Sequence, residues 1–139
     1  MDKLYITGDL VYIHWSLRII SNCDGYYATY YDENESLQEV NVNVIEGIPI
    51  TPEILEKNGW DKEGNDGSDF SLSEAFMGGD EDDEDNYTCF QLYYQNKKDG
   101  WVIDMRGEPL KFEIHYIHEL QHLFFGLGIN HEMDVQIWV

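Results

Sequence analysis

The residues best suited to chemistry form the sequence His118-Glu119-Leu120-Gln121-His122, an H-E-x-x-H pattern. On a helix, two histidines at this spacing lie one turn apart and can bind the same zinc ion. The glutamate then acts as the general base on a zinc-bound water whose pKa has fallen to about 7. The pattern therefore indicates a zinc-dependent hydrolase, with His118 and His122 as metal ligands and Glu119 as the catalytic residue.

A catalytic zinc ion also needs a third protein ligand, and no known spacing supplies one here. His131 and Glu132 lie nine and ten residues beyond His122, and only a sharp turn at residues 126–128 would bring either back. A helical wheel places the histidines opposite the apolar residues Ile117, Leu120, Leu123, Phe124 and Leu127. The alternative interpretation is a structural amphipathic helix on which these polar residues spell the motif by coincidence.

The second notable feature is the acidity of residues 61–86, which hold 11 acids and one base and therefore half of the net charge of −20. The segment ends in the run Asp80, Glu81, Asp82, Asp83, Glu84 and Asp85. A calcium loop would need an acid at its first position and a glutamate at its twelfth, where Lys62 and Ser73 stand. We expect an exposed, mobile insertion whose acidic run contacts a partner.

The composition limits the classes of function. The chain has 139 residues, of which 42% are hydrophobic and 14% aromatic, enough for one folded domain with a core. A net charge of −20 repels nucleic-acid phosphates and anionic lipid. We therefore expect neither direct nucleic-acid binding nor membrane binding. The N-terminus lacks the pattern of a signal peptide, and Cys23 and Cys89 cannot build a disulfide framework. We expect a cytoplasmic protein.

Residues 3–60 have the pattern of a β-rich block followed by a short helix. Short apolar runs separated by turn residues, such as Asp24-Gly25, predict several antiparallel strands. The alternation of Val40, Val42 and Val44 with polar residues extends this pattern to a further strand. We expect a strongly bent sheet or a small half-open barrel. Thr51-Pro52 then predicts a helix start, and Asn58-Gly59 its end.

Residues 87–139 form the second ordered block. The pattern predicts a hairpin of residues 87–95 and 101–105, a third strand at 110–114, a helix at 115–125 and an edge strand at 135–139. The chain is therefore expected to be a single α+β domain spanning residues 1–139, with the acidic insertion between its two blocks.

Two stretches resemble a known family. The segment from Ile48 to Trp60, IPITPEILEKNGW, and the helix from Tyr116 to Leu127, YIHELQHLFFGL, are similar to segments of small uncharacterised proteins from Bacteroidota, their phages and mobile elements. That family has glutamine at the position of Glu119 and sometimes asparagine at that of His122. The resemblance implies a structural helix and supplies no catalytic residue.

These observations favour a non-enzymatic acidic module that binds a protein, acting as a nucleic-acid mimic or as a modulator of a host protein. No cofactor is expected in that case, and the partner has a basic surface that the acidic run would contact. The alternatives are the zinc-dependent hydrolase and a structural or accessory protein.

Overall fold

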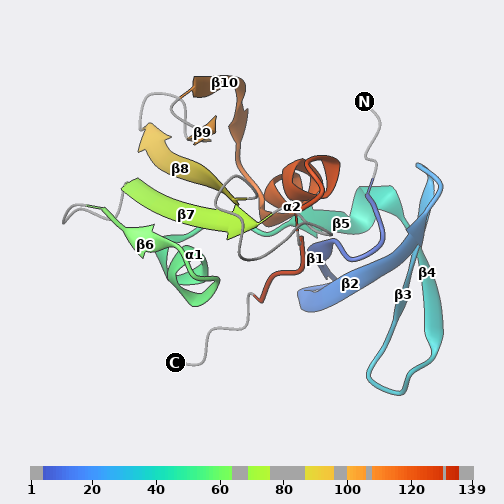
Figure 1. Ribbon diagram of the computed structural model, residues 1–139. Helices are drawn as coiled ribbons and strands as arrows, with labels where there is room; N and C mark the ends of the chain where they lie inside the picture. The colour runs from blue at the N-terminus through green and yellow to red at the C-terminus, as the bar shows by residue number, and fades with distance from the viewer. Residues whose placement is uncertain are drawn as a thin grey trace.

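The chain folds into two five-stranded antiparallel sheets with a ten-residue helix between them (Figure 1). The computed structural model describes residues 5–63, 69–75, 87–95, 100–105, 108–129 and 131–134. The strands are β1 (Leu10–Ile13), β2 (Ser16–Cys23), β3 (Tyr27–Tyr31), β4 (Leu37–Asn41), β5 (Ile45–Gly47), β6 (Asp61–Lys62), β7 (Asp69–Ala75), β8 (Tyr87–Gln95), β9 (Gly100–Met105) and β10 (Glu108–Ile114). The helices are η1 (Val42–Val44), α1 (Pro52–Lys57) and α2 (Ile117–Gly126). This content confirms the α+β class.

The first sheet has the strand order β4-β3-β2-β1-β5. Its edges are β4 and β5, so it is an open sheet and not a closed barrel; the strong bend remains a prediction. The expected turn at Asp24-Gly25 is confirmed, because the Asp24 carboxylate accepts hydrogen bonds from the N–H groups of Tyr26 and Tyr27 and Gly25 has a positive φ.

The predicted strand through Val40, Val42 and Val44 was wrong in its second half. Strand β4 ends at Asn41, whose side chain accepts a hydrogen bond from Asn43 N–H and starts the 3-10 turn η1. Asparagine side chains compete with the sheet ladder in this way, so a period-2 pattern that includes asparagines can hide a turn. After this turn, β5 returns to pair with β1.

Helix α1 follows its local signals closely. The Thr51 hydroxyl accepts a hydrogen bond from Ile54 N–H, Pro52 is the first helical residue, and the helix stops at Asn58, with Gly59 at a φ of +88°. Both buried residues of the helix, Ile54 and Leu55, pack into the core below the second sheet.

The second sheet has the order β10-β9-β8-β7-β6 and begins inside the segment expected to be a mobile insertion. Strand β7 pairs with β8 from Asp69 to Ala75, and the Phe70 side chain is fully buried. The expectation was therefore wrong for residues 61–62 and 69–75, because a few apolar residues in register outweigh the acidic composition. The remainder of that segment, residues 64–68 and 76–86, and the edge strand expected at 135–139 lie outside the described residues.

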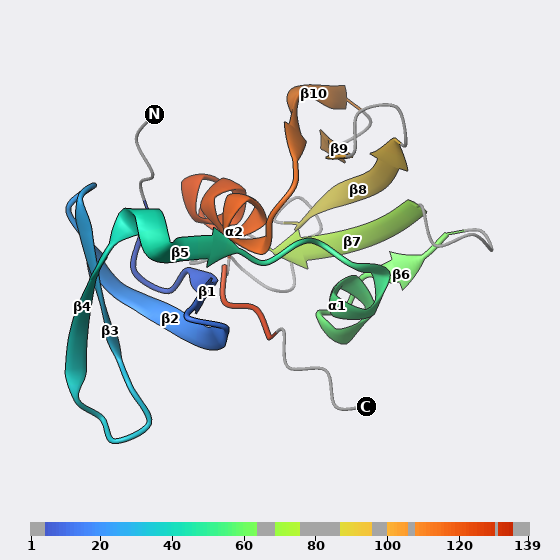
Figure 2. The ribbon, with the colours of Figure 1, turned by 180° about the vertical axis from the view of Figure 1, so that it is seen from behind.

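The predicted C-terminal helix is confirmed as α2, which lies between the two sheets in both views (Figures 1 and 2). Its buried side chains Ile117, Leu120 and Phe124 join the main core with α1 and the second sheet. A second, smaller core lies on one face of the first sheet and contains Tyr5, Val11, Ile13, Ile20, Ala28, Tyr30, Val42 and Ile45. In the described part of the chain, no helix is long and apolar enough to cross a bilayer.

Candidate functional site

Glu119, the expected general base, caps helix α2. Its Oε1 accepts hydrogen bonds from the backbone N–H groups of His115 and Tyr116, each at 2.9 Å. A glutamate at the third position of a helix satisfies N–H groups at the helix start in this way. The carboxylate is therefore held at the backbone, where it stabilises the helix instead of facing a water bound between the histidines.

This capping role gives a first prediction. Replacing Glu119 by alanine is expected to lower the free energy of unfolding by about 1 kcal/mol, whereas Glu119→Gln, which keeps an oxygen acceptor, should retain most of that stability. Urea denaturation of the two variants measures the difference. Equal losses in both variants would show that the charge of Glu119, and not its hydrogen bonds to the backbone, stabilises the helix.

His118, the first expected metal ligand, is packed between two aromatic rings. Its ring centroid lies 5.0 Å from that of Tyr5 and 5.7 Å from that of Tyr116, which is stacked on it. Within the described residues its Nδ1 is buried and makes no hydrogen bond. Burial lowers the pKa of His118 below its ordinary value of 6.5, and the neighbouring His122 lowers it further, against the opposing effects of Asp9 and Glu119.

The lowered pKa of His118 predicts a pH dependence of folding. Below pH 6.5 the unfolded chain binds a proton at this residue more readily than the folded chain does, so acidification costs stability until the pH passes the folded pKa. His118→Phe keeps a ring between the two tyrosines and removes the titrating group. We expect this variant to lose less stability than the wild type between about pH 7 and about pH 5. Urea midpoints across that range measure it, and parallel losses in both proteins would contradict the prediction.

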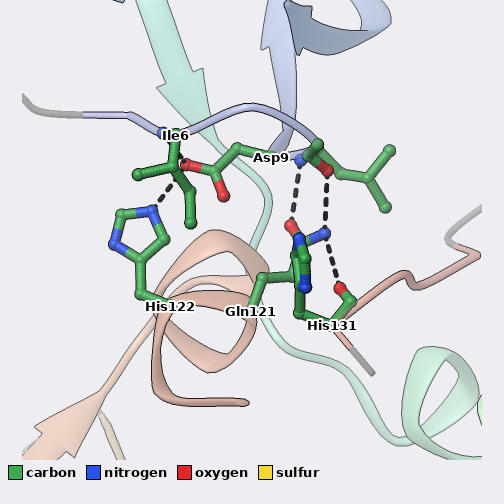
Figure 3. Close-up of polar contacts among 7 residues, drawn as sticks. Ile6, Asp9, Gln121, His122 and His131 are labelled. Atoms are coloured by element: carbon green, nitrogen blue, oxygen red, sulfur yellow. Dashed lines mark hydrogen bonds and ion pairs between the residues drawn. The ribbon is translucent and has the colours of Figure 1, made fainter. Parts of the chain in front are cut away.

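His122, the second expected ligand, is paired with a buried carboxylate. Its Nε2 lies 2.6 Å from Oδ2 of Asp9, a side chain with no exposed surface (Figure 3). The same Oδ2 accepts a hydrogen bond from Ile6 N–H. Because His122 is itself about a third exposed, at 34%, it stands between this carboxylate and water. The pair ties the N-terminal loop to helix α2.

Gln121 completes this attachment and was not singled out from the sequence. Its Oε1 accepts a hydrogen bond from Leu10 N–H, and its Nε2 donates to the carbonyl oxygens of Gly8 and His131 (Figure 3). The side chain is fully buried. Its one signal was its place on the helical wheel, roughly 40° from Ile117 at the border of the apolar stripe. Asp9 carried no comparable signal.

Beside the motif lies an open hollow of about 320 Å³, lined by Ile114, Glu119, His122 and Leu123. Two polar atoms of its lining residues are already engaged: Glu119 Oε1 in the helix cap and His122 Nε2 in the pair with Asp9. The chain does turn back after Gly128, which has a φ of +73°, but the His131 ring packs against Phe125 at 5.2 Å. Across the described ranges, no three His, Cys, Asp or Glu side chains gather in a group that could hold a metal ion. The residues of the motif thus connect helix α2 to the N-terminal loop and to the C-terminal segment at His131.

The best candidate for a functional site lies on the first sheet. Of the ten large hydrophobic residues that are exposed in the described structure, eight belong to this sheet and its turns. We call them the apolar surface: Tyr12, Trp15, Ile19, Tyr26, Tyr27, Tyr31, Leu37 and Val44. Soluble domains leave single hydrophobic side chains exposed, but a group of this size on one element marks an interaction site.

The strand register explains why these residues stay outside. Val11, Ile13 and Ile20 point to the smaller core, so their neighbours Tyr12 and Ile19 point to the opposite face of the sheet. On that face only Leu10 and Leu17 reach the main core. Tyr31 and Leu37, paired across β3 and β4, share the open part of the face. A hollow of about 470 Å³ between Ile19, Tyr31 and the loop at Thr7-Gly8 indents it.

The electrostatic surroundings of the apolar surface are acidic. Residues 10–47 contain six acids and a single base, Arg18. That base is engaged within the sheet, because its Nη2 lies 2.7 Å from Glu33 Oε1 and its guanidinium lies over the Tyr30 ring at 5.2 Å from the centroid. The sheet therefore offers aromatic rings and carboxylates to the outside.

The residues predicted to contact a partner, Asp80 to Asp85, lie outside the described residues. No known protein family, curated protein or solved structure matches this chain.

Proposed function

We propose that this chain is a non-enzymatic module that binds a protein with a basic surface. The observation that carries the proposal is the apolar surface, which gathers eight exposed hydrophobic side chains on one sheet. Tyrosine and tryptophan are enriched in protein interfaces, where a few of them supply most of the binding energy. The acids around them, with a net charge of −20 for the chain, favour a partner of opposite charge.

In the finer form of the proposal, the chain occupies a groove of the partner that otherwise binds nucleic acid. The carboxylates of residues 80–85 would take the place of phosphates, and electrostatic steering would speed the encounter. This form fits the resemblance to proteins of phages and mobile elements, which suggests modulation of a host protein.

The contacts of the H-E-x-x-H residues support a non-enzymatic role. Glu119, Gln121 and His122 each make hydrogen bonds that hold the N-terminal loop, helix α2 or the C-terminal segment. A hydrolase would need His122 free to bind the metal and Glu119 free to act on the metal-bound water. The zinc-dependent hydrolase is therefore the weaker interpretation.

Binding to a defined basic probe tests the proposal. An arginine-rich core histone is titrated with the chain over a series of salt concentrations, and displacement of a labelled DNA duplex from the histone is followed in parallel. We expect binding that weakens steeply with salt, and displacement of the duplex. A basic protein that binds no nucleic acid serves as the control for charge attraction alone.

Two variants separate the contributions of charge and of aromatic contact. Replacing the six acids at 80–85 by their amides should flatten the dependence of affinity on salt. The double variant Trp15→Ala, Tyr31→Ala leaves the charge unchanged, so it should weaken binding by about tenfold with the same salt dependence. Phe125→Ala, an exposed aromatic residue on α2, is the matched control and should bind like the wild type. Absence of histone binding at low salt would refute the proposed function. Equal binding to the basic protein that binds no nucleic acid would refute the finer form, in which the chain mimics nucleic acid.

The turn that carries Trp15 gives a further prediction. His14 and Trp15 are the two central residues of the β1–β2 hairpin, and both have positive φ, at 50° and 69°. Such a turn favours Asn-Gly, and other residues pay of order 1 kcal/mol each for this conformation. The double substitution His14→Asn, Trp15→Gly should therefore raise the free energy of unfolding by about 1–2 kcal/mol while it weakens histone binding. Urea denaturation measures the gain, and a loss of stability would show that Trp15 contributes to the fold.

A further inference from the structure

The tip of the β1–β2 hairpin forms an open hollow of about 240 Å³, lined by Tyr12, His14, Trp15, Val44 and Glu46. Trp15 is 92% exposed, so its indole makes little contact with the protein although its backbone is held in the left-handed region. Residues in such backbone conformations cluster at binding and active sites. The exposed indole is therefore available to a partner.

The lining of this hollow combines aromatic rings with one carboxylate. Glu46 stands directly across from Tyr12 in the β1–β5 ladder, which places their Cβ atoms about 5 Å apart on the same face of the sheet. Both side chains are exposed, and no cation among the described residues pairs with Glu46. Two aromatic side chains and a carboxylate thus line the same hollow.

Resting on the proposed function, we propose that this hollow receives an arginine side chain of the partner protein. A guanidinium is planar, stacks on tryptophan or tyrosine and can donate two parallel hydrogen bonds to a carboxylate. The apolar stem of the arginine would lie along Val44, which is 40% exposed. Lysine offers a strongly hydrated point charge without a stacking plane, so the lining selects arginine over lysine.

The charge distribution supports this choice of occupant. The sheet that carries the hollow, residues 10–47, holds six acids, and its single base, Arg18, is held by Glu33 on the face opposite to Tyr12. Charge complementarity therefore attracts a cationic side chain to this sheet, and the aromatic rings and Glu46 determine where it binds.

Three capped pentapeptides test the proposal by NMR. Each has a central arginine, lysine or citrulline flanked by two glycines on either side, and the Trp15 indole N–H signal, assigned with Trp15→Phe, is followed during titration. Citrulline has the shape of arginine without its charge. We expect saturable shifts with the arginine peptide, with a dissociation constant on the order of 1 mM. Lysine should bind several-fold more weakly, and citrulline about tenfold more weakly.

A matched pair of variants isolates Glu46 from general charge. Glu46→Gln should weaken binding of the arginine peptide about fivefold. Glu39→Gln removes the same charge from exposed strand β4 outside the hollow, and it should bind the arginine peptide within about twofold of the wild type. Equal shifts with arginine and citrulline, equal binding of lysine, or equal losses in the two variants would each overturn the proposal.

The failure of this inference can be told apart from the failure of the proposed function. If the peptides do not bind, but the wild type and Glu46→Gln displace DNA from the histone equally, the proposed arginine site is wrong. The proposal that the chain binds a basic protein is then unaffected. If the wild type does not bind the histone at all, the proposed function itself is wrong.

Discussion

Replacing Gln121 by leucine is expected to lower the free energy of unfolding by about 3–5 kcal/mol, although the two side chains are close in volume. The amide of Gln121 is fully buried and satisfies Leu10 N–H and the carbonyl oxygens of Gly8 and His131. Leucine would leave the buried Leu10 N–H and the two partly buried carbonyl oxygens without this partner, and each such group costs up to about 1–3 kcal/mol. Urea denaturation of the two proteins measures the loss.

Gln38→Leu is the matched control for this experiment. Gln38 is exposed on β4, and among the described residues its amide donates to the Asp32 side chain alone, so its replacement should change stability by less than about 0.5 kcal/mol. Hydrogen exchange adds a local readout, because the Leu10 amide should lose protection in Gln121→Leu before the strands of the second sheet do. A loss below about 1 kcal/mol would mean that the three backbone groups find other partners.

The elements that the sequence predicted well are those with local signals. Thr51, Pro52 and Gly59 bracket α1, and the apolar stripe of Ile117, Leu120 and Phe124 predicts α2. In each case the decisive contacts lie within four residues of one another, so a window of sequence contains them. Strand β7 was missed because its partner β8 lies more than ten residues away and its composition is acidic.

The roles of the motif residues could not be predicted for the same physical reason. Gln121 and Leu10 are 111 residues apart in the sequence, and His122 and Asp9 are 113 apart. A pattern of five residues on one helix shows which side chains share a face, but not which distant loop packs against that face. The spacing that fits a zinc site therefore also fits a helix that fastens the N-terminal loop.

The apolar surface lies on the part of the first sheet that the rest of the protein does not cover. Helix α2 contacts this sheet through Gln121 and the loop before β1, and residues 48–50 join it to the segment before α2. In the first sheet, aromatic residues that would normally fill a core stand at exposed register positions, and Trp15 stands in a turn conformation that favours glycine. The exposed rings and the strained turn lower the stability of the fold, which is the pattern expected of a binding surface.

His122→Ala is expected to lower the free energy of unfolding by about 2–3 kcal/mol. The substitution leaves the Asp9 carboxylate, which has no exposed surface, with Ile6 N–H as its one remaining partner among the described residues. Removing the partner of a buried carboxylate costs about 3–5 kcal/mol, and the partial exposure of His122 lowers that figure because water can enter. Urea denaturation near neutral pH measures the loss.

A double-mutant cycle with Asp9→Asn then separates this pair from other contacts of His122. Without the charge on residue 9, His122→Ala should cost only about 0.5–1 kcal/mol, which gives a coupling energy of about 1.5–2 kcal/mol. His122→Gln should recover part of the loss, because the amide nitrogen of glutamine can donate to Asp9 from nearly the same place as Nε2 of histidine. If His122 served mainly as a metal ligand, the cycle would show no coupling, and the loss in His122→Ala would appear only with zinc present. The size of the coupling therefore decides between a structural pair and a metal site.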